Sequence, residues 1–126
     1  MSNLIIRAAT ADDLAFIRAS WMASYWKSGF APRVTQRVFV EGYGKKMARL
    51  LQVSSVQVAC FESVPEEVLG YSVLEGDTGH WVYVKAPYRR QHIGSALVRG
   101  MKWHTTDTRH GRLLAAKVES QFNPWR

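Results

Sequence analysis

The chain has 126 residues, 47% of them hydrophobic, and carries a formal net charge of +7. This length is that of one domain, 1–126, and the apolar fraction excludes an intrinsically disordered protein. All of the excess charge lies in residues 85–126, which hold nine basic and two acidic residues. Such a patch favours a polyanionic partner, which could be nucleic acid, an anionic membrane surface or a phosphorylated cofactor.

No apolar stretch reaches the roughly 20 residues of a membrane span, and charged residues follow the N-terminus before any signal-like segment. We therefore expect a cytoplasmic protein without a membrane partner. The single cysteine, Cys60, cannot form an internal disulfide, and its apolar neighbours predict a buried thiol in a strand.

The first third of the chain predicts a strand and two helices. A short apolar run, 4–7, is followed by Thr10 and Asp13, spaced as in a capping box that opens a helix. Apolar residues then recur at helical spacing until Gly29, and one buried face is expected to hold Leu14, Ile17, Trp21 and Tyr25. A second helix is expected over 35–51.

The rest of the chain predicts strands and one further helix. Strands are expected over 53–61, 68–74 and 80–84, and the Gly- and Asp-containing turn before the third predicts an antiparallel hairpin. The period then becomes helical from Ile93 to a glycine C-cap near 110–111, with Leu97, Met101 and His104 on the same face as Ile93.

A last strand, 113–118, is expected to lie parallel to the strand 80–84, because a helix connects them. The order β-α-α-β-β-β-α-β predicts a mixed α/β (α+β) domain with one mixed sheet. Residues 119–126 are expected to be a tail.

The segment from the strand 82–84 into the last helix is the most informative. The basic loop Arg89, Arg90 and Gln91 precedes a helix that opens with Gly94, Ser95 and Ala96. The first turn of a helix offers backbone N–H groups without internal partners and the positive end of its dipole. This combination favours binding of a diphosphate.

This segment resembles the CoA-binding segment of the GNAT family of acetyl-CoA-dependent N-acetyltransferases, and the element order agrees along nearly the whole chain. The resemblance implies that the acetyl-CoA cosubstrate is held by the following residues: Val82, Tyr83, Val84, Arg89, Arg90, Gln91, His92, Ile93, Gly94, Ser95 and Ala96. In the register that we favour, set by Arg89, His92 stands at the family's first glycine. A register shifted to Gln91 would instead align Gly94 and Ala96. The chain also departs from the family after Asn123, where no tyrosine follows to protonate the leaving thiolate.

Acetyl transfer to an amine needs a group that accepts a proton and a donor for the thiolate. His80 and Glu75 flank the hairpin turn and are candidate bases, while Tyr83 and Tyr88 are candidate acids. Trp26 and Phe30 lie off the core face of the first helix. The resemblance to the GNAT family implies that the acceptor pocket lies there, so these two residues are candidates for its lining. No metal-binding cluster or hydrolase motif is present in the sequence.

Three functions stay open at this point. The first is an N-acetyltransferase acting on a small-molecule or peptide primary amine through a direct ternary complex. The second is a non-catalytic module of the same fold that binds CoA or a protein. The third is a small basic nucleic-acid-binding protein, which no helix-turn-helix or RNA-binding signature supports. Because the chain stops where family members add two strands, we also expect a homodimer that covers the sheet edge.

Overall fold

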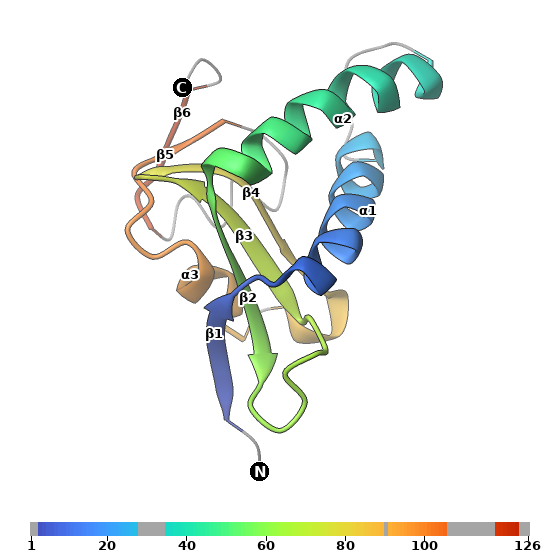
Figure 1. Ribbon diagram of the computed structural model, residues 1–126. Coiled ribbons are helices and arrows are strands. Elements are labelled where there is room, and N and C mark those ends of the chain that lie inside the picture. Colours follow the sequence, from blue (N-terminus) through green and yellow to red (C-terminus); the bar gives the residue numbers. More distant parts are fainter. Residues whose placement is uncertain (1–2, 28–34, 90, 106–117, 124–126) are drawn as a thin grey trace.

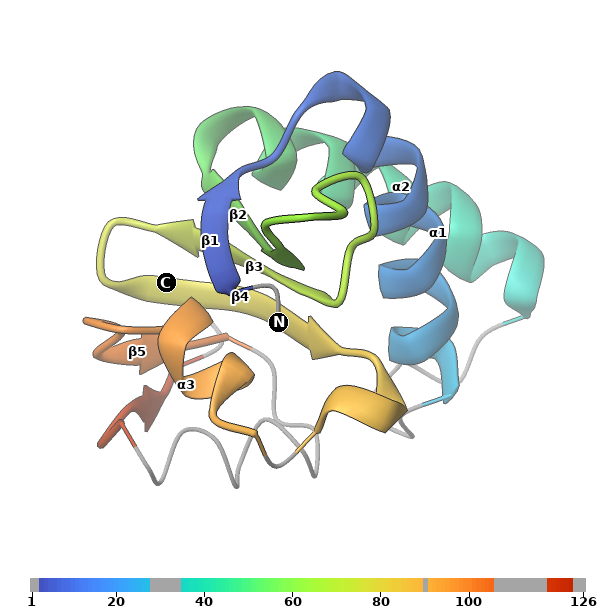
Figure 2. The ribbon, with the colours of Figure 1, turned by 90° about the horizontal axis from the view of Figure 1, so that it is seen from below.

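The computed structural model describes residues 3–27, 35–89, 91–105 and 118–123. A six-stranded sheet in the order β1-β2-β3-β4-β5-β6 is covered by α1 and α2 on one face and by α3 on the other (Figure 1, Figure 2). The elements in chain order are β1 (Leu4–Ala8), α1 (Ala11–Lys27), α2 (Gln36–Val53), β2 (Ser55–Phe61), β3 (Gly70–Glu75), β4 (Thr78–Val84), a 3-10 turn η1 (Ala86–Tyr88), α3 (Ile93–Leu97), β5 (Trp103–His104) and β6 (Gln121–Phe122). The mixed α/β class is confirmed.

The start of α1 is fixed by the carboxylate of Asp13. Its Oδ2 accepts hydrogen bonds from the Thr10 backbone N–H at 2.7 Å and from the Thr10 hydroxyl at 3.1 Å. Arg7 of β1 donates to both oxygens of the same carboxylate, at 2.7 and 3.1 Å, and to the Pro65 carbonyl oxygen at 2.7 Å. The helix start expected from Thr10 and Asp13 is thus confirmed. Through Arg7, the Asp13 carboxylate also connects α1 to β1 and to the loop between β2 and β3.

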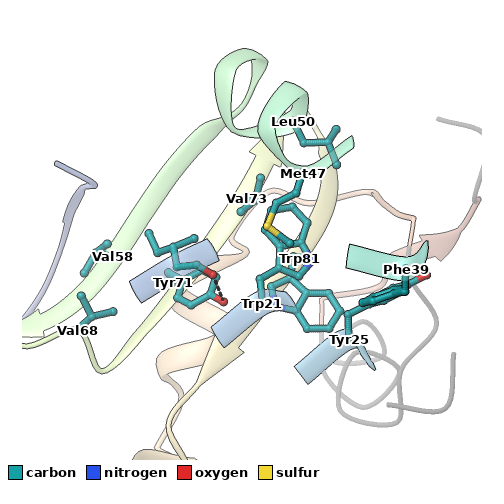
Figure 3. Close-up of a cluster of buried hydrophobic side chains, with 11 residues drawn as sticks. Trp21, Tyr25, Phe39, Met47, Leu50, Val58, Val68, Tyr71, Val73 and Trp81 are labelled. Carbon is teal, nitrogen blue, oxygen red and sulfur yellow. Dashed lines mark hydrogen bonds between the residues drawn. The ribbon is translucent and has the colours of Figure 1, made fainter. Parts of the chain in front are cut away.

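The larger core lies between the helices α1 and α2 and the sheet (Figure 3). Ile17, Trp21 and Tyr25 are buried there, as the helical spacing predicts. Trp21 stacks on Trp81 of β4 with ring centroids 6.0 Å apart, and Tyr25 stacks on Phe39 of α2 at 5.6 Å. Through these ring contacts, α1 and α2 pack as one layer against the sheet.

Strands β1 to β4 form an antiparallel meander, which confirms the predicted hairpin. Cys60 in β2 is fully buried and pairs with Ile5 of β1, as expected for a structural thiol. The ladder between β3 and β4 contains a bulge, because Val73 pairs with Trp81 while Leu74 pairs with Gly79. His80 therefore has no opposite residue on β3.

The helix predicted from Ile93 to residue 110 is wrong beyond Leu97. Gly100 adopts a left-handed conformation with φ of +85°, and a turn closes between Val98 and Met101. A residue without Cβ takes this conformation readily, so it ends a helix. Trp103 and His104, expected on or beside a helical face, form β5, which runs parallel to β4 at Thr78 and Gly79.

The C-terminal expectations are partly corrected. Residues 113–117 of the predicted last strand lie outside the described residues, and Val118 lies in a turn. Among the described residues, the parallel neighbour of β4 is Trp103–His104. The expected tail contains β6, which pairs in parallel with β5 through Gln121 and Phe122.

Acid should weaken the fold through Asp13. The Arg7 guanidinium and the Thr10 donors lower the pKa of Asp13 from 3.8 to about 2. Because the folded pKa lies below the unfolded value, the stabilisation is complete above about pH 4 and is lost as the pH falls toward 2. We expect Asp13→Asn to lower the free energy of unfolding at pH 7 by about 2 kcal/mol.

Urea unfolding of wild type and Asp13→Asn is measured from pH 7 to pH 2. The difference between their free energies of unfolding gives the contribution of Asp13 at each pH. The exposed neighbour Asp12 supplies the control variant Asp12→Asn. A difference that stays constant over this pH range would contradict the role given to Asp13.

Two glycines should respond oppositely to alanine. A Cβ added at Gly70 of β3 would lie 2.6 Å from the Tyr83 backbone oxygen, whereas a Cβ at Gly42 of α2 meets nothing within 4 Å. We expect Gly70→Ala to destabilise the fold by about 1 to 3 kcal/mol. Gly42→Ala should stabilise it by about 0.5 to 1 kcal/mol, because alanine is the better helix former. Denaturant unfolding compares the two, and equal effects would contradict this packing.

Candidate active site and cofactor loop

The candidate site is built on β4, whose side chains serve both faces of the sheet. Trp81 and Tyr83 belong to the core under α1 and α2, whereas Val82 and Val84 pack with Ile93 and Leu97 of α3 on the opposite face. The period of two along a strand produces this division. Packing on both faces holds the backbone of β4 in place.

The two edges of β4 differ. One edge pairs with β3 along the whole strand, whereas the other pairs with β5 at Thr78 and Gly79. The Thr105 backbone N–H donates to the Gly79 carbonyl oxygen at 3.0 Å and is the last described contact of this ladder. Along Trp81–Val84 no strand of the described chain pairs with this second edge. We call the point where the described contacts between β4 and β5 end the β4–β5 fork.

The loop after β4 turns the chain from the sheet into α3. Its first part is η1, and the Tyr88 and Arg89 backbone N–H groups donate to the carbonyl oxygens of Lys85 and Ala86. The exposed Arg89 side chain donates through Nε to the Val84 carbonyl oxygen at 2.8 Å. Gln91 is also exposed, and Arg90 lies outside the described residues.

His92 occupies the N-cap of α3 in the left-handed conformation, with φ of +65° and ψ of +10°. This backbone conformation is the one that glycine adopts without cost. In the register set by Arg89, His92 stands where the pattern of the GNAT family has a glycine. The backbone of His92 has the conformation that a glycine would adopt there. Behind His92, the N–H groups of Ile93, Gly94 and Ser95 form the first turn of α3, where a helix leaves N–H groups without internal partners.

His80 and Glu75, the two candidate bases, are in direct contact. Glu75 Oε1 lies 2.9 Å from His80 Nε2, and Thr105 Oγ1 lies 3.0 Å from His80 Nδ1. The His80 side chain is 5% exposed and that of Glu75 is 46% exposed. The bulge places His80 between Glu75 of β3 and Thr105, the residue that follows β5. Thr105 was not predicted from the sequence, where it lies within the segment expected to be helical.

The candidate acids lie elsewhere in the described structure. The ring of Tyr83 packs against Tyr71 at 5.5 Å and Phe16 at 6.4 Å, under α1. Tyr88 packs edge-on against Phe61, 6.1 Å away, beyond the far end of β4 from His80. Burial raises the pKa of the neighbouring Tyr71 above its usual range, so that phenol stays protonated.

Trp26 lines a shallow groove of about 260 Å³ between the end of α1 and the start of α2. Its neighbours in the groove are mainly apolar, and the described lining holds no carboxylate. Phe30, the second residue predicted for an acceptor pocket, lies outside the described residues.

The described residues contain no cluster of three or more potential metal ligands. In the same part of the chain, no helix combines the length and the hydropathy that crossing a membrane requires.

Comparisons with known proteins give structural matches alone, since no family model and no curated protein matches the sequence. A GCN5-related N-acetyltransferase from Rhodopseudomonas palustris matches with a TM-score of 0.55 and 19% identity, covering 93% of this chain and 69% of its own. The apo form of YjaB from Escherichia coli matches with a TM-score of 0.54 and 18% identity, covering 76% and 62%.

A GNAT family acetyltransferase from Brucella melitensis, solved with acetyl-CoA, matches with a TM-score of 0.50 and 19% identity, covering 93% of this chain and 71% of its own. The chain spans 62% of the length of YjaB, so it is shorter than these structures. The matches extend over most of the chain. The chain has the fold of the GCN5-related N-acetyltransferases.

Proposed function

We propose that this chain is an acetyl-CoA-dependent N-acetyltransferase that moves an acetyl group to a primary amine through a direct ternary complex. The observation that carries the proposal is the path of the chain after β4. The strand, one edge of which pairs with no described strand along Trp81–Val84, leads into a basic loop. His92 then adopts a glycine-like conformation directly before a helix start. The fold shared with GNAT structures supports this function.

The residues of this segment fit a diphosphate. Backbone N–H groups at the start of α3, from Ile93, Gly94 and Ser95, are donors for phosphate oxygens. Arg89 and Gln91 are exposed beside them, and the sequence adds Arg90. Each hydrogen bond to a charged phosphate contributes on the order of 1.5 to 3 kcal/mol. These residues would hold the diphosphate of CoA.

The edge of β4 that faces away from β3 fits the pantetheine arm. Backbone groups of Val82 and Val84 point to this edge and would hydrogen-bond the amides of the arm, as an added strand would, whereas those of Tyr83 face Tyr71 of β3. From Val84 to His80 the strand rises about 13 Å, at about 3.3 Å per residue. The arm therefore leads from the phosphate loop toward the contact between His80 and Glu75. Bound acetyl-CoA supplies the thioester that the amine attacks.

The acceptor would enter from the side of α1 and α2. The groove beside Trp26 is apolar, which favours an amine with an aliphatic or aromatic body. Phe30 remains a prediction from the sequence for this pocket, and a homodimer also remains a prediction.

Binding of acetyl-CoA should raise the melting temperature, because the ligand binds the folded state. We expect Arg89→Glu to reduce this shift strongly, since it replaces a cation of the phosphate loop by an anion. The matched control is Arg18→Glu, an exposed arginine of α1. Differential scanning fluorimetry with and without acetyl-CoA gives the result.

An undiminished shift in Arg89→Glu would place the cosubstrate elsewhere. A normal shift in wild type without acetyl transfer to any amine would instead identify a CoA-binding module that is not an enzyme.

His92→Gly should favour the loop conformation already present. A residue with Cβ loses roughly 1 to 2 kcal/mol in the left-handed region, and glycine removes that cost while giving the unfolded chain more freedom. We expect His92→Gly to have unchanged or slightly higher stability and to bind acetyl-CoA. The β-branched variant His92→Val disfavours the left-handed conformation, so it should be less stable and bind acetyl-CoA more weakly. Calorimetric titration with acetyl-CoA and thermal unfolding test this pair. A weaker cosubstrate affinity in His92→Gly would show that the imidazole itself contacts the ligand.

A further inference from the structure

Both ring nitrogens of His80 are already engaged in the structure. Nε2 lies 2.9 Å from Glu75 and Nδ1 lies 3.0 Å from the hydroxyl of Thr105. The side chain is 5% exposed, so neither nitrogen faces a space that an amine could enter without breaking a hydrogen bond. His80 can therefore act on a substrate proton through one of its two partners.

The chemistry of the partners assigns the protons. A carboxylate accepts hydrogen bonds and does not donate them, so Nε2 carries the proton that points to Glu75. In a neutral imidazole the other nitrogen is then an acceptor. The hydroxyl of Thr105 consequently donates its proton to Nδ1.

This hydroxyl suits either charge state of His80. When the imidazole gains a proton, Nδ1 becomes a donor and Thr105 Oγ1 accepts from it, because a hydroxyl can do both. Glu75 then balances the positive charge across a 2.9 Å contact. A buried histidine can thus change charge at this point without leaving a polar atom unpaired.

Thr105 also lies at the place where the proposed function needs a proton carrier. Its backbone N–H donates to the Gly79 carbonyl oxygen at 3.0 Å, the last contact with β4 among the described residues on this side. The edge of β4 proposed for the pantetheine arm begins beside this point. Thr105 is half-buried, whereas the imidazole behind it is buried.

Resting on the proposed function, we infer that the Thr105 hydroxyl is the group that exchanges protons with the reactants, in a relay formed by Thr105, His80 and Glu75. As the neutral amine forms its C–N bond to the acetyl carbon, Thr105 Oγ1 takes one proton from the amine nitrogen. Its own hydroxyl proton moves to His80 Nδ1.

The same relay returns the proton when the C–S bond breaks and its electron pair leaves on sulfur. His80 Nδ1 gives its proton back to Thr105, whose hydroxyl proton passes to the thiolate. The products are an amide and the free CoA thiol, and the three side chains end in their starting state. One hydroxyl thus serves as acceptor and as donor, whereas the sequence suggests a separate base and a separate phenol for these roles.

The test compares Thr105→Val, Thr105→Ser and wild type in acetyl transfer. A panel of polyamines, aminoglycosides, amino acids and peptide N-termini supplies the acceptor, with CoA thiol release as the readout. We expect Thr105→Val to lower kcat by about 10² to 10⁴-fold, the usual contribution of a general acid or base, with an unchanged thermal shift on acetyl-CoA binding. Thr105→Ser keeps a hydroxyl and should recover most of the activity.

Thr78→Val is the matched control. It removes the hydroxyl of a buried threonine of β4, and that hydroxyl donates to Asp77 Oδ1 at 3.4 Å. We expect its kcat to stay close to wild type. All variants are assayed well below their measured melting temperatures, so that a change in kcat does not reflect unfolding.

The outcomes separate the relay from the proposed function. An active wild type with an equally active Thr105→Val overturns the relay alone, as does a serine variant as inactive as the valine variant. An acetyl group found on Thr105 by mass spectrometry of quenched enzyme also overturns it, in favour of a covalent route. A wild type that releases no CoA thiol with any acceptor overturns the proposed function and the relay with it.

Discussion

The candidate site depends on the unequal pairing of β4. The strand is bound to β3 along one edge over its whole length, while β5 joins the other edge for two residues. Unpaired backbone groups at a strand edge accept an added extended chain. His80 and Thr105 meet at the same fork. The bulge at His80 lies next to Gly79, which accepts the last described hydrogen bond between β4 and the chain after β5.

The aromatic core makes this geometry rigid from the other face. Trp81 is flanked by Trp21, stacked at 6.0 Å, and by Tyr25, edge-on at 5.7 Å. Among the described residues the indole nitrogens of Trp21 and Trp81 are buried without a hydrogen-bond partner. Such unpaired donors cost free energy, so this layer gains its stability from ring packing rather than from polar contacts. Trp81, which follows the bulge, is thereby held between α1 and β3. This restricts the freedom of its neighbour His80.

Much of the fold could be predicted because its signals are local. The spacing of Ile17, Trp21 and Tyr25 indicates one buried helical face, and Thr10 with Asp13 indicates where that helix begins. The sequence does not indicate the end of α3, because Gly100 lies inside a sequence of helical period. Its positive φ becomes visible in the structure alone. The sequence indicates His80 and Glu75 as two separate candidate bases beside one turn, and their contact is seen in the structure alone. Thr105 is brought to His80 by a parallel strand pair that no local pattern specifies.

The burial of Cys60 gives the molecule an internal reporter of sheet opening. Its thiol is fully buried in β2, and β2 is hydrogen-bonded on both sides, by β1 and β3. A thiol reagent can reach it when these strands separate, so the rate of labelling measures how often the sheet opens under native conditions. The chain carries no second cysteine, so no other thiol contributes to the labelling. Strand separation at the N-terminal edge can therefore be followed independently of events at the β4–β5 fork.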